Sequence, residues 1–424
     1  MNLMEKVIGR ASNVSQVNPG EIVWANADLV LLHDSSAARV VPIFEKEFGG
    51  SVWEASKIVI VFDHFSPPSD ASRAAAQRKI RKFARQQGIR RVHDVGDGAC
   101  HTILRDRYAC PGMLIVGSDS HMSHSGVMGC VAIPIGHTEC ATVLKTGQLW
   151  LRVPELYKLS VVGNLPIGVM AKDIFLNFCR KLTTSGAIYK AIEFGGNAVL
   201  NLPIDQRAVL TGMVVEIGAK TAYIEPDEKV IVKCETSVDG LQYKQYIVKN
   251  DLDTKYAKEI QVKADELEPL VAYPNNVDNV KSVTEAEGIE IDQIYLGSCV
   301  GGNYSDLEMA AKILRGKKIS PNVRLIVSPA TRDIYIRACS HGIIRDLLEA
   351  GATMISTGCG ACFGSHSGVL ASGERCLSAT TRNFKGRMGS AEAEVYLASS
   401  ATLAASAIHG KITDPRSILG GKGY

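Results

Sequence analysis

Two cysteines in the stretch STGCGACFG, Cys359 and Cys362, have the C-x-x-C spacing found in metal sites and in redox-active thiol pairs. Taken alone, the pair permits three interpretations: half of a structural zinc site, a thioredoxin-like dithiol, or two thiols that only pack. Zinc is disfavoured because it would need a second C-x-x-C or a His pair, and His366 has no partner at such a spacing. A thioredoxin-like pair is disfavoured because it belongs to much shorter chains.

A third thiol changes the interpretation. Cys299, in LGSCVGGN, follows a strand-like run just as Cys359 does. A [4Fe–4S] cluster normally takes about four thiolates, so three would leave one iron without a protein ligand. An iron with an open position acts as a Lewis acid on a hydroxyl or carboxylate, which predicts elimination chemistry. We expect the remaining cysteines to be ordinary buried thiols: Cys100, Cys110, Cys130, Cys140, Cys179, Cys234, Cys339 and Cys376.

The elements that must position these thiols are short apolar runs followed by polar residues. Such runs occur at 58–62, 113–117, 293–297 and 352–356, and the first two lead into the sequences DH and SDSH. Between them, helical patterns cover 305–318, with Ser305 as the expected N-cap, 332–351 and 393–410. Alternating strands and helices predict an α/β fold with largely parallel sheets. Ligands of such sheets lie beyond the carboxyl ends of the strands, so all four polar segments should line one cleft.

Length and composition agree with an α/β enzyme. A chain of 424 residues is too long for one core and predicts several domains. Its 46% hydrophobic and 21% charged residues are ordinary for a globular protein. The net charge of +3 gives no support to nucleic-acid binding. No apolar run is long enough for a membrane span, and the N-terminus has no signal-peptide core, so we expect a cytoplasmic protein without a membrane partner.

Domain boundaries are less well defined by the sequence. A segment rich in Lys, Glu and Asp near 235–270 interrupts the α/β pattern and predicts a linker or surface region. We expect three α/β domains, at 1–155, 156–272 and 273–424, with the Asp and His loops in the first and the cysteines in the third.

The ordered motifs DH, GACH, GSDSH, GSC, GCGAC and SGERCLSATTRNFKGR resemble the aconitase superfamily, above all the large subunits of its split isomerases of the 3-isopropylmalate dehydratase and homoaconitase type. The resemblance extends from EKVIGRAS to AIHGKITDP. It implies three α/β domains around a [4Fe–4S] cluster held by Cys299, Cys359 and Cys362. It also implies that the mobile swivel domain is absent from this chain and is supplied by a small subunit, giving a hetero-oligomer that acts on a small hydroxy-carboxylate.

The resemblance also implies roles for the polar loops. Dehydration of a hydroxy acid needs a base for a carbon-bound proton and an acid for the departing hydroxyl. An Asp beside a His stabilises the protonated imidazole, so Asp63 and His64 would donate that proton. The implied relay partners are His101, Asp119, His121 and Glu193. Ser120, Arg382 and Arg387 would bind the substrate, the arginines by guanidinium forks on its carboxylates.

Three functions remain open at this point. The leading one is the large subunit of an iron–sulfur hydro-lyase/isomerase that acts on a 2-hydroxy di- or tricarboxylate. The second is a dehydratase or hydratase of a substituted malate such as 2,3-dimethylmalate, and the third is a regulatory paralogue without activity. The sequence departs from the usual family motifs at Met122, Val300, Gly301 and Thr381, all in loops expected at the site, which is compatible with an altered substrate or with weakened chemistry. The near-neutral charge disfavours an RNA-binding role.

Overall fold

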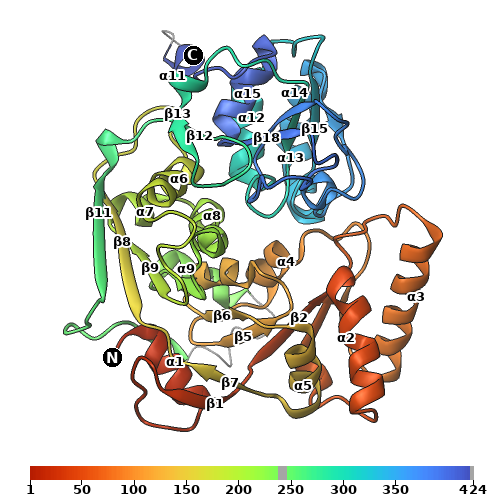
Figure 1. The fold of residues 1–424 in the computed structure, drawn as a ribbon, viewed down its shortest axis with the longest axis vertical. Helices are drawn as coiled ribbons and strands as arrows, with labels where there is room; N and C mark the ends of the chain where they lie inside the picture. The colour runs from red at the N-terminus through yellow and green to blue at the C-terminus, as the bar shows by residue number, and fades with distance from the viewer. Residues whose placement is uncertain (237–245, 421–424) are drawn as a thin grey trace.

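The structure of the chain is a computed structural model that describes residues 1–236 and 246–420. Three α/β layers follow one another along the chain. Figure 1 shows the N-terminal sheet and its helices at the bottom, the second sheet at the left and the C-terminal sheet at the top. The predicted α/β class with largely parallel sheets is therefore confirmed.

The N-terminal sheet is parallel throughout, and its central strands are buried along their whole length. Its strand order is β4 (Arg91–His93), β3 (Ile58–Val61), β2 (Leu29–His33), β5 (Leu114–Gly117) and β6 (Val131–Pro134). Continuous apolar strands of this kind require cover on both faces. A separate antiparallel ribbon joins β1 (Ile22–Asn26) to β7 (Gln148–Arg152).

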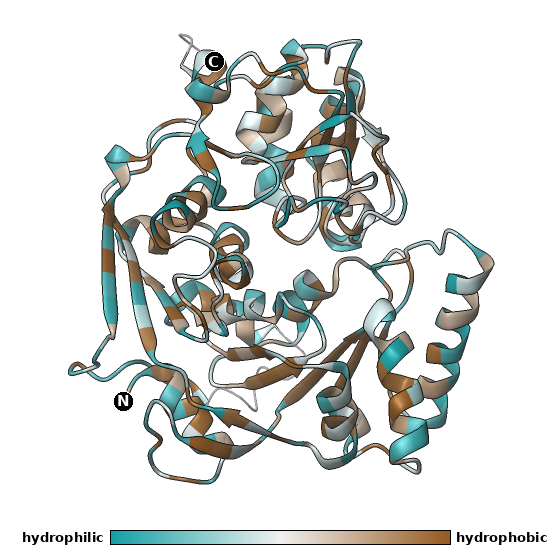
Figure 2. Cartoon of the chain, in the orientation of Figure 1, coloured by the Kyte–Doolittle hydropathy of each residue, from teal (hydrophilic) through white to brown (hydrophobic). Residues whose placement is uncertain are grey.

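Alternate residues of these strands enter two different cores. Leu29, Leu31 and Val59 belong to one apolar cluster, whereas Val30 and Leu32 belong to another. The second cluster receives helices α1 (Leu3–Ala11), α2 (Asp34–Glu47), α3 (Ala71–Gln86) and α5 (His137–Thr146), and the first receives α4 (Cys100–Arg107). Figure 2 shows the strands as mainly hydrophobic and the outer side of α3 as mainly hydrophilic.

The second sheet shares the first of those cores. Its parallel strands are β10 (Thr221–Tyr223), β9 (Ala191–Gly195), β8 (Leu156–Val162) and β11 (Lys258–Lys263). Its helices are α6 (Ala171–Leu182), α7 (Asn197–Asn201), α8 (Ile204–Met213) and α9 (Glu228–Glu235). Because β11 pairs with β8 over six residues, this part of the expected 235–270 linker is an integral strand. Residues 237–245 of that linker lie outside the described residues.

The C-terminal sheet is mixed. Its order is β13 (Val280–Ser282), β12 (Leu270–Ala272), β18 (Glu394–Leu397), β17 (Arg375–Ser378), β14 (Gln293–Leu296), β15 (Arg324–Val327) and β16 (Thr353–Met354). Its helices are α11 (Val283–Ala286), α12 (Tyr304–Leu314), α13 (Arg332–Ser340), α14 (Ile343–Ala350), α15 (Ser400–His409) and α16 (Arg416–Leu419). The third sheet thus starts at Leu270, just before the expected boundary at 272, and the domain limits themselves stay predictions.

Three helix predictions need correction. Helix α12 starts at Tyr304 after Asn303, not after Ser305, because Asp306 accepts a hydrogen bond from the Asn303 N–H. The 332–351 pattern is two helices, separated at Gly342, whose φ of 75° is left-handed. The 393–410 pattern begins with β18, and only its second half is helical.

Two further sequence expectations can be compared with the structure. The expected buried thiols are buried except Cys339, which is exposed at the surface of α13. Within the described residues, none of the helices combines the length and the apolar character that a bilayer crossing demands.

Candidate active site

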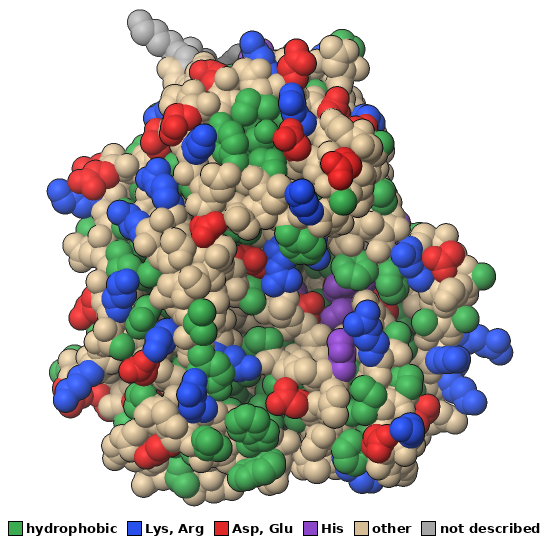
Figure 3. All heavy atoms as spheres, viewed as in Figure 1, with side chains coloured by type: hydrophobic (Ala, Val, Ile, Leu, Met, Phe, Trp, Pro, Cys, Tyr) green, Lys and Arg blue, Asp and Glu red, His purple; other side chains and the backbone are tan. Residues whose placement is uncertain are grey.

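Parallel pairing brings the carboxyl ends of three N-terminal strands to one edge. His33 at the end of β2 is the register partner of Val61 in β3, and Leu31 is the partner of Gly117 in β5. The polar residues that follow β3 and β5 are therefore neighbours, as predicted. Figure 3 shows histidine side chains in a hollow between the N-terminal and C-terminal parts.

Asp63 and His64 form a buried ion pair. The Asp63 Oδ1 and His64 Nδ1 atoms lie 2.8 Å apart, and Asp63 Oδ2 accepts a hydrogen bond from the Cys100 N–H at 2.7 Å. Burial would lower the pKa of His64, but the Asp63 carboxylate raises it to about 9. Burial would likewise raise the pKa of Asp63, yet His64 keeps it below its usual range. The imidazole is therefore protonated at neutral pH.

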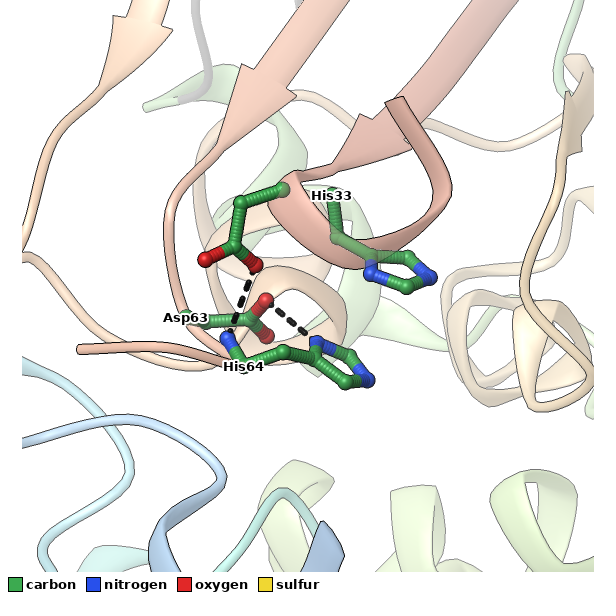
Figure 4. A group of neighbouring side chains, drawn as sticks. His33, Asp63 and His64 are labelled. Carbon is green, nitrogen blue, oxygen red and sulfur yellow. Dashed lines mark hydrogen bonds and ion pairs between the residues drawn. The ribbon is translucent and has the colours of Figure 1, made fainter. Parts of the chain in front are cut away.

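His33 is a site residue that the sequence interpretation missed. Its ring stacks on that of His64, with centroids 3.9 Å apart and planes at 18° (Figure 4). Burial and the charge of His64 lower the pKa of His33 to about 3, so this ring is neutral. Its Nδ1 accepts from the Ser36 N–H at 3.4 Å, which leaves the proton on Nε2, 3.4 Å from Asp119 Oδ2.

A second group of residues centres on Asp119. Its Oδ1 accepts from the His121 N–H at 2.7 Å and lies 2.8 Å from His101 Nε2. Burial would raise the pKa of Asp119, but the neighbouring His101 and His121 hold it well below its usual range. Ser120 Oγ lies 3.2 Å from His121 Nδ1, so Asp119, Ser120 and His121 form one connected network.

Glu216 also joins this network, although no sequence motif indicates it. Its Oε1 lies 3.1 Å from His121 Nε2 and accepts a hydrogen bond from Arg382 Nε at 2.7 Å. Burial would raise the pKa of Glu216, but these two partners lower it. Glu216 lies in the 3₁₀ helix Val214–Ile217 that follows α8, and no sequence motif precedes or follows it.

Glu193, in contrast, is not brought to the network. This β9 carboxylate is buried, and its Oε2 accepts from Asn250 Nδ2 at 2.6 Å, Tyr256 Oη at 3.0 Å and Tyr223 Oη at 3.2 Å. Its Oε1 lies 3.5 Å from Lys158 Nζ. With these contacts made, Glu193 holds the second sheet to the segment that follows residue 245. The carboxylate that contacts His121 is Glu216 instead.

Of the three cysteines, Cys359 contacts the Asp63–His64 pair, and Cys299, Cys359 and Cys362 lie near enough for their charges to interact. Cys359 Sγ lies 3.5 Å from Asp63 Oδ2 and 3.8 Å from His64 Nδ1, and its N–H donates to Asp63 O at 3.0 Å. Arg387 Nη2 lies 3.7 Å from Cys362 Sγ. Burial first, and then the charge of Cys362, raises the pKa of Cys299. Thiolates at these positions therefore need a positively charged partner to exist at neutral pH.

Several buried polar atoms around the thiols have no partner within the described part of the protein. They are His101 Nδ1, Ser298 Oγ next to Cys299, and Arg387 Nε. Buried polar atoms are normally paired, so a polar group bound beside the thiols could be hydrogen-bonded by these three atoms. Three soft thiols, a guanidinium and unpaired donors fit a thiolate-bound iron–sulfur cluster.

Fold and site together define an α/β protein whose thiols, imidazoles and carboxylates converge between its N-terminal and C-terminal sheets. The model of the aconitase family (aconitate hydratase) matches residues 5–287 and 280–410. The chain belongs to the aconitase family.

Curated relatives match over their whole length. The chain is 45% identical over 421 residues to the 3-isopropylmalate dehydratase large subunit 1 of Methanopyrus kandleri, covering 98% of this chain and 99% of that protein. It is 42% identical to the probable methanogen homoaconitase large subunit of Methanosarcina mazei, covering 93% of this chain and 100% of that protein. The crystal structure of holo aconitase X from Thermococcus kodakaraensis superposes with a TM-score of 0.50 at 12% identity, covering 89% of each chain, which shows the fold alone.

Proposed function

We propose that this chain is the large catalytic subunit of an iron–sulfur hydro-lyase/isomerase that acts on a 2-hydroxy di- or tricarboxylate of the 3-isopropylmalate or homoaconitate type. The names of the full-length relatives support the class. The observation that carries the proposal is the buried Asp63–His64 pair with Cys359 Sγ within 3.8 Å, because it joins a proton donor to a metal-binding thiol.

Cys299, Cys359 and Cys362 would hold the [4Fe–4S] cluster. When bound, a cluster with three thiolate ligands offers one iron as a Lewis acid for a hydroxyl or carboxylate. Arg387, which lies against Cys362 Sγ, would offset the negative charge of the thiolates. Ser298 Oγ is free to donate to the same group.

The side chains around the thiols divide the remaining work. His64, protonated because Asp63 is beside it, is the acid that delivers a proton to the departing hydroxyl. Asp119 orients the His101 ring by its contact with His101 Nε2, which would leave the unpaired His101 Nδ1 available to the reacting group. Arg382 and Ser120 would bind the substrate carboxylates, and Glu216 fixes Arg382 in place.

The small subunit is the proposed partner, because the relatives are named as large subunits. We propose that it supplies the base that removes the carbon-bound proton. The described site residues are suited to other tasks: His64 is an acid, the arginines bind carboxylates, and the carboxylates of Asp63, Asp119 and Glu216 are paired with His or Arg side chains. Without the small subunit, turnover should fall by about 10²- to 10⁴-fold, the usual contribution of a general base.

Iron content tests the cluster. Anaerobically prepared chain should bind close to the four irons of a complete cluster and absorb near ~400 nm, and Cys299→Ser should remove most of both. Cys376→Ser is the matched control, because this buried thiol lies in β17 and is no proposed ligand. Retention of full iron by Cys299→Ser, Cys359→Ser and Cys362→Ser would refute the three-thiolate site.

Turnover tests the reaction. The chain should be assayed with and without its cognate small subunit on 3-isopropylmalate, homocitrate-type acids and 2,3-dimethylmalate. Activity only in the mixture, with a hydroxyl moved between adjacent carbons, supports the isomerase, and loss of water without isomerisation identifies a simple dehydratase. An intact cluster without turnover on any of these acids would contradict the proposal and favour the regulatory paralogue.

A further inference from the structure

Helix α3 concentrates positive charge on a nearly neutral protein. Its sixteen residues carry six Lys or Arg side chains and no Asp or Glu, whereas the whole chain has a net charge of +3. Two of the six, Arg73 and Arg81, pair with Asp70 and Asp94. The other four are exposed and have no ion pair with any described residue: Arg78, Lys79, Lys82 and Arg85.

This arrangement is unfavourable for α3 by itself. Positions three and four apart on a helix are neighbours, so Arg78 and Lys82, and likewise Lys82 and Arg85, repel each other. A solvated helix would normally intersperse acidic residues among them. Figure 3 shows Lys and Arg side chains at the right edge of the molecule, where Figure 1 places α3. The repulsion is relieved when an acidic surface covers the helix.

A groove lies beside these charges, between α2 and α3. Its volume is about 560 Å³, and small or apolar side chains line it, among them Ala38, Val41, Ala75 and Ile80. Lys79 and Lys82 line it from α3, and Glu45 from α2. An apolar floor with a basic wall fits an amphipathic segment that carries acidic residues along one side.

Both walls of the groove lead directly to the site. Helix α2 starts at Asp34, whose Oδ1 accepts from the His64 N–H at 3.0 Å. Gln77, buried on α3, donates through Nε2 to Asp34 Oδ2 at 3.0 Å and to Phe65 O at 2.7 Å. A segment bound in the groove would therefore contact both helices that hold the His64 loop in place.

We infer that the α2–α3 groove is the docking site for an acidic amphipathic segment of the small subunit. The inference rests on the proposed function, which supplies the partner, and the unpaired positive charge of α3 requires that the docking segment be acidic. Docking at this place brings the partner against the two helices whose Asp34 and Gln77 side chains hold the His64 loop, so association and assembly of the active geometry are linked through Gln77.

The test compares binding of the cluster-loaded chain to its cognate small subunit. Lys79→Glu/Lys82→Glu should raise Kd by about tenfold or more near ~50 mM salt, and the difference should shrink near ~300 mM, because exposed charges are screened there. Lys312→Glu/Lys411→Glu is the matched control: it makes the same charge change at exposed lysines of the C-terminal part and should leave Kd within about twofold. Ala75→Trp, which fills the groove without a charge change, should also weaken binding.

Hydrogen exchange locates the contact. Amides of Ala71–Gln86 should exchange more slowly in the complex than in the free chain, and the control variant should show the same slowing. Wild type that binds and turns over with the small subunit, together with unchanged Kd in both groove variants, would overturn this inference and leave the proposed function standing. Wild type that neither binds nor turns over with the small subunit would overturn both.

Other occupants give different results. A chain that self-associates without the small subunit, and loses this in Lys79→Glu/Lys82→Glu, would assign the groove to a second copy and overturn the inference. RNA binding that this variant abolishes, with Kd for the small subunit unchanged, would overturn it in favour of nucleic acid.

Discussion

Replacing Asp34 by Asn should reduce turnover by disturbing His64, although Asp34 has no proposed role in binding substrate. Oδ1 of Asp34 accepts from the N–H groups of His64 at 3.0 Å and Ser35 at 3.1 Å, and Oδ2 accepts from Phe65 N–H at 3.0 Å and Gln77 Nε2 at 3.0 Å. The Asn side chain has only one accepting oxygen. Two of these four donors, either the pair at Oδ1 or the pair at Oδ2, would therefore face the NH₂ group of Asn and lose their acceptor. Each buried donor left unpaired costs about 1–3 kcal/mol.

The loop can relieve that cost only by moving His64. A displacement of about 1 Å at a reacting group costs roughly 10²-fold in rate, so we expect kcat of the reconstituted enzyme to fall about 10- to 100-fold, with KM changed less than about threefold. Asp173→Asn is the matched control, because Asp173 is also fully buried and accepts backbone N–H groups, those of Met170 and Leu270, but in the second part. Wild-type kcat in Asp34→Asn, or an equal loss in the control, would refute the reasoning.

Three other outcomes follow from the structure. Glu216→Gln should lower kcat/KM about tenfold or more, whereas Glu193→Gln should change it less than about threefold, which separates the two carboxylates by steady-state kinetics. Burial raises the pKa of Asp173 from 3.8 in the unfolded chain to about 7 in the folded protein. The protonated carboxyl therefore contributes its full stability below pH 3.8, and this contribution is lost as the pH rises to about 7. Asp173→Asn removes the titration and should flatten the dependence of Tm on pH over that range. Gly301→Ala should lose iron, measured per chain, because a Cβ there would lie 2.3 Å from the nearest side-chain atom, whereas Gly195→Ala, with 3.8 Å of clearance, should retain it.

The strands were the most predictable part of the fold. Runs at 58–62, 113–117 and 293–297 became β3, β5 and β14 with shifts of one residue, because a buried parallel strand is a continuous apolar run that a turn interrupts. The helix boundaries were less predictable. Asn303, the residue before α12, is placed by side-chain contacts that only the tertiary structure brings about: its amide donates to Cys299 O at 2.8 Å and accepts from Arg105.

The site was predictable where it follows a strand. His33 and Asp34 obey the same rule, since the run ADLVLLHD ends in both, and applying that rule to it would have found them. Glu216 could not be found in this way. It reaches His121 because α8 packs on the 3₁₀ helix Met122–Met128, where Thr211 donates to His124 O at 3.0 Å. A residue placed by helix packing leaves no local pattern.

The departures at Val300 and Gly301 bear on whether the site is still functional. Val300 is buried with 1% exposure, and Gly301 is packed so closely against Ala379 that no larger residue fits. Both positions are therefore used for packing the loop after β14. Polar side chains at positions 300 and 301 could have hydrogen-bonded this loop. That support comes instead from Asn303, whose Nδ2 donates to Cys299 O. His124 Nε2 lies 3.3 Å from the same oxygen.

A loop that had lost its role would not be expected to retain this support. The carbonyl of a proposed ligand is held from two sides by buried groups, one of which is itself fixed by Arg105 Nη1 at 3.0 Å. Support of this kind is characteristic of ligand loops, because small displacements of a ligand weaken metal binding. Asn303→Ala should therefore reduce iron content and make the cluster more labile to oxygen, whereas an inactive paralogue would tolerate the change. Unaltered iron retention in Asn303→Ala would remove this argument against the regulatory alternative.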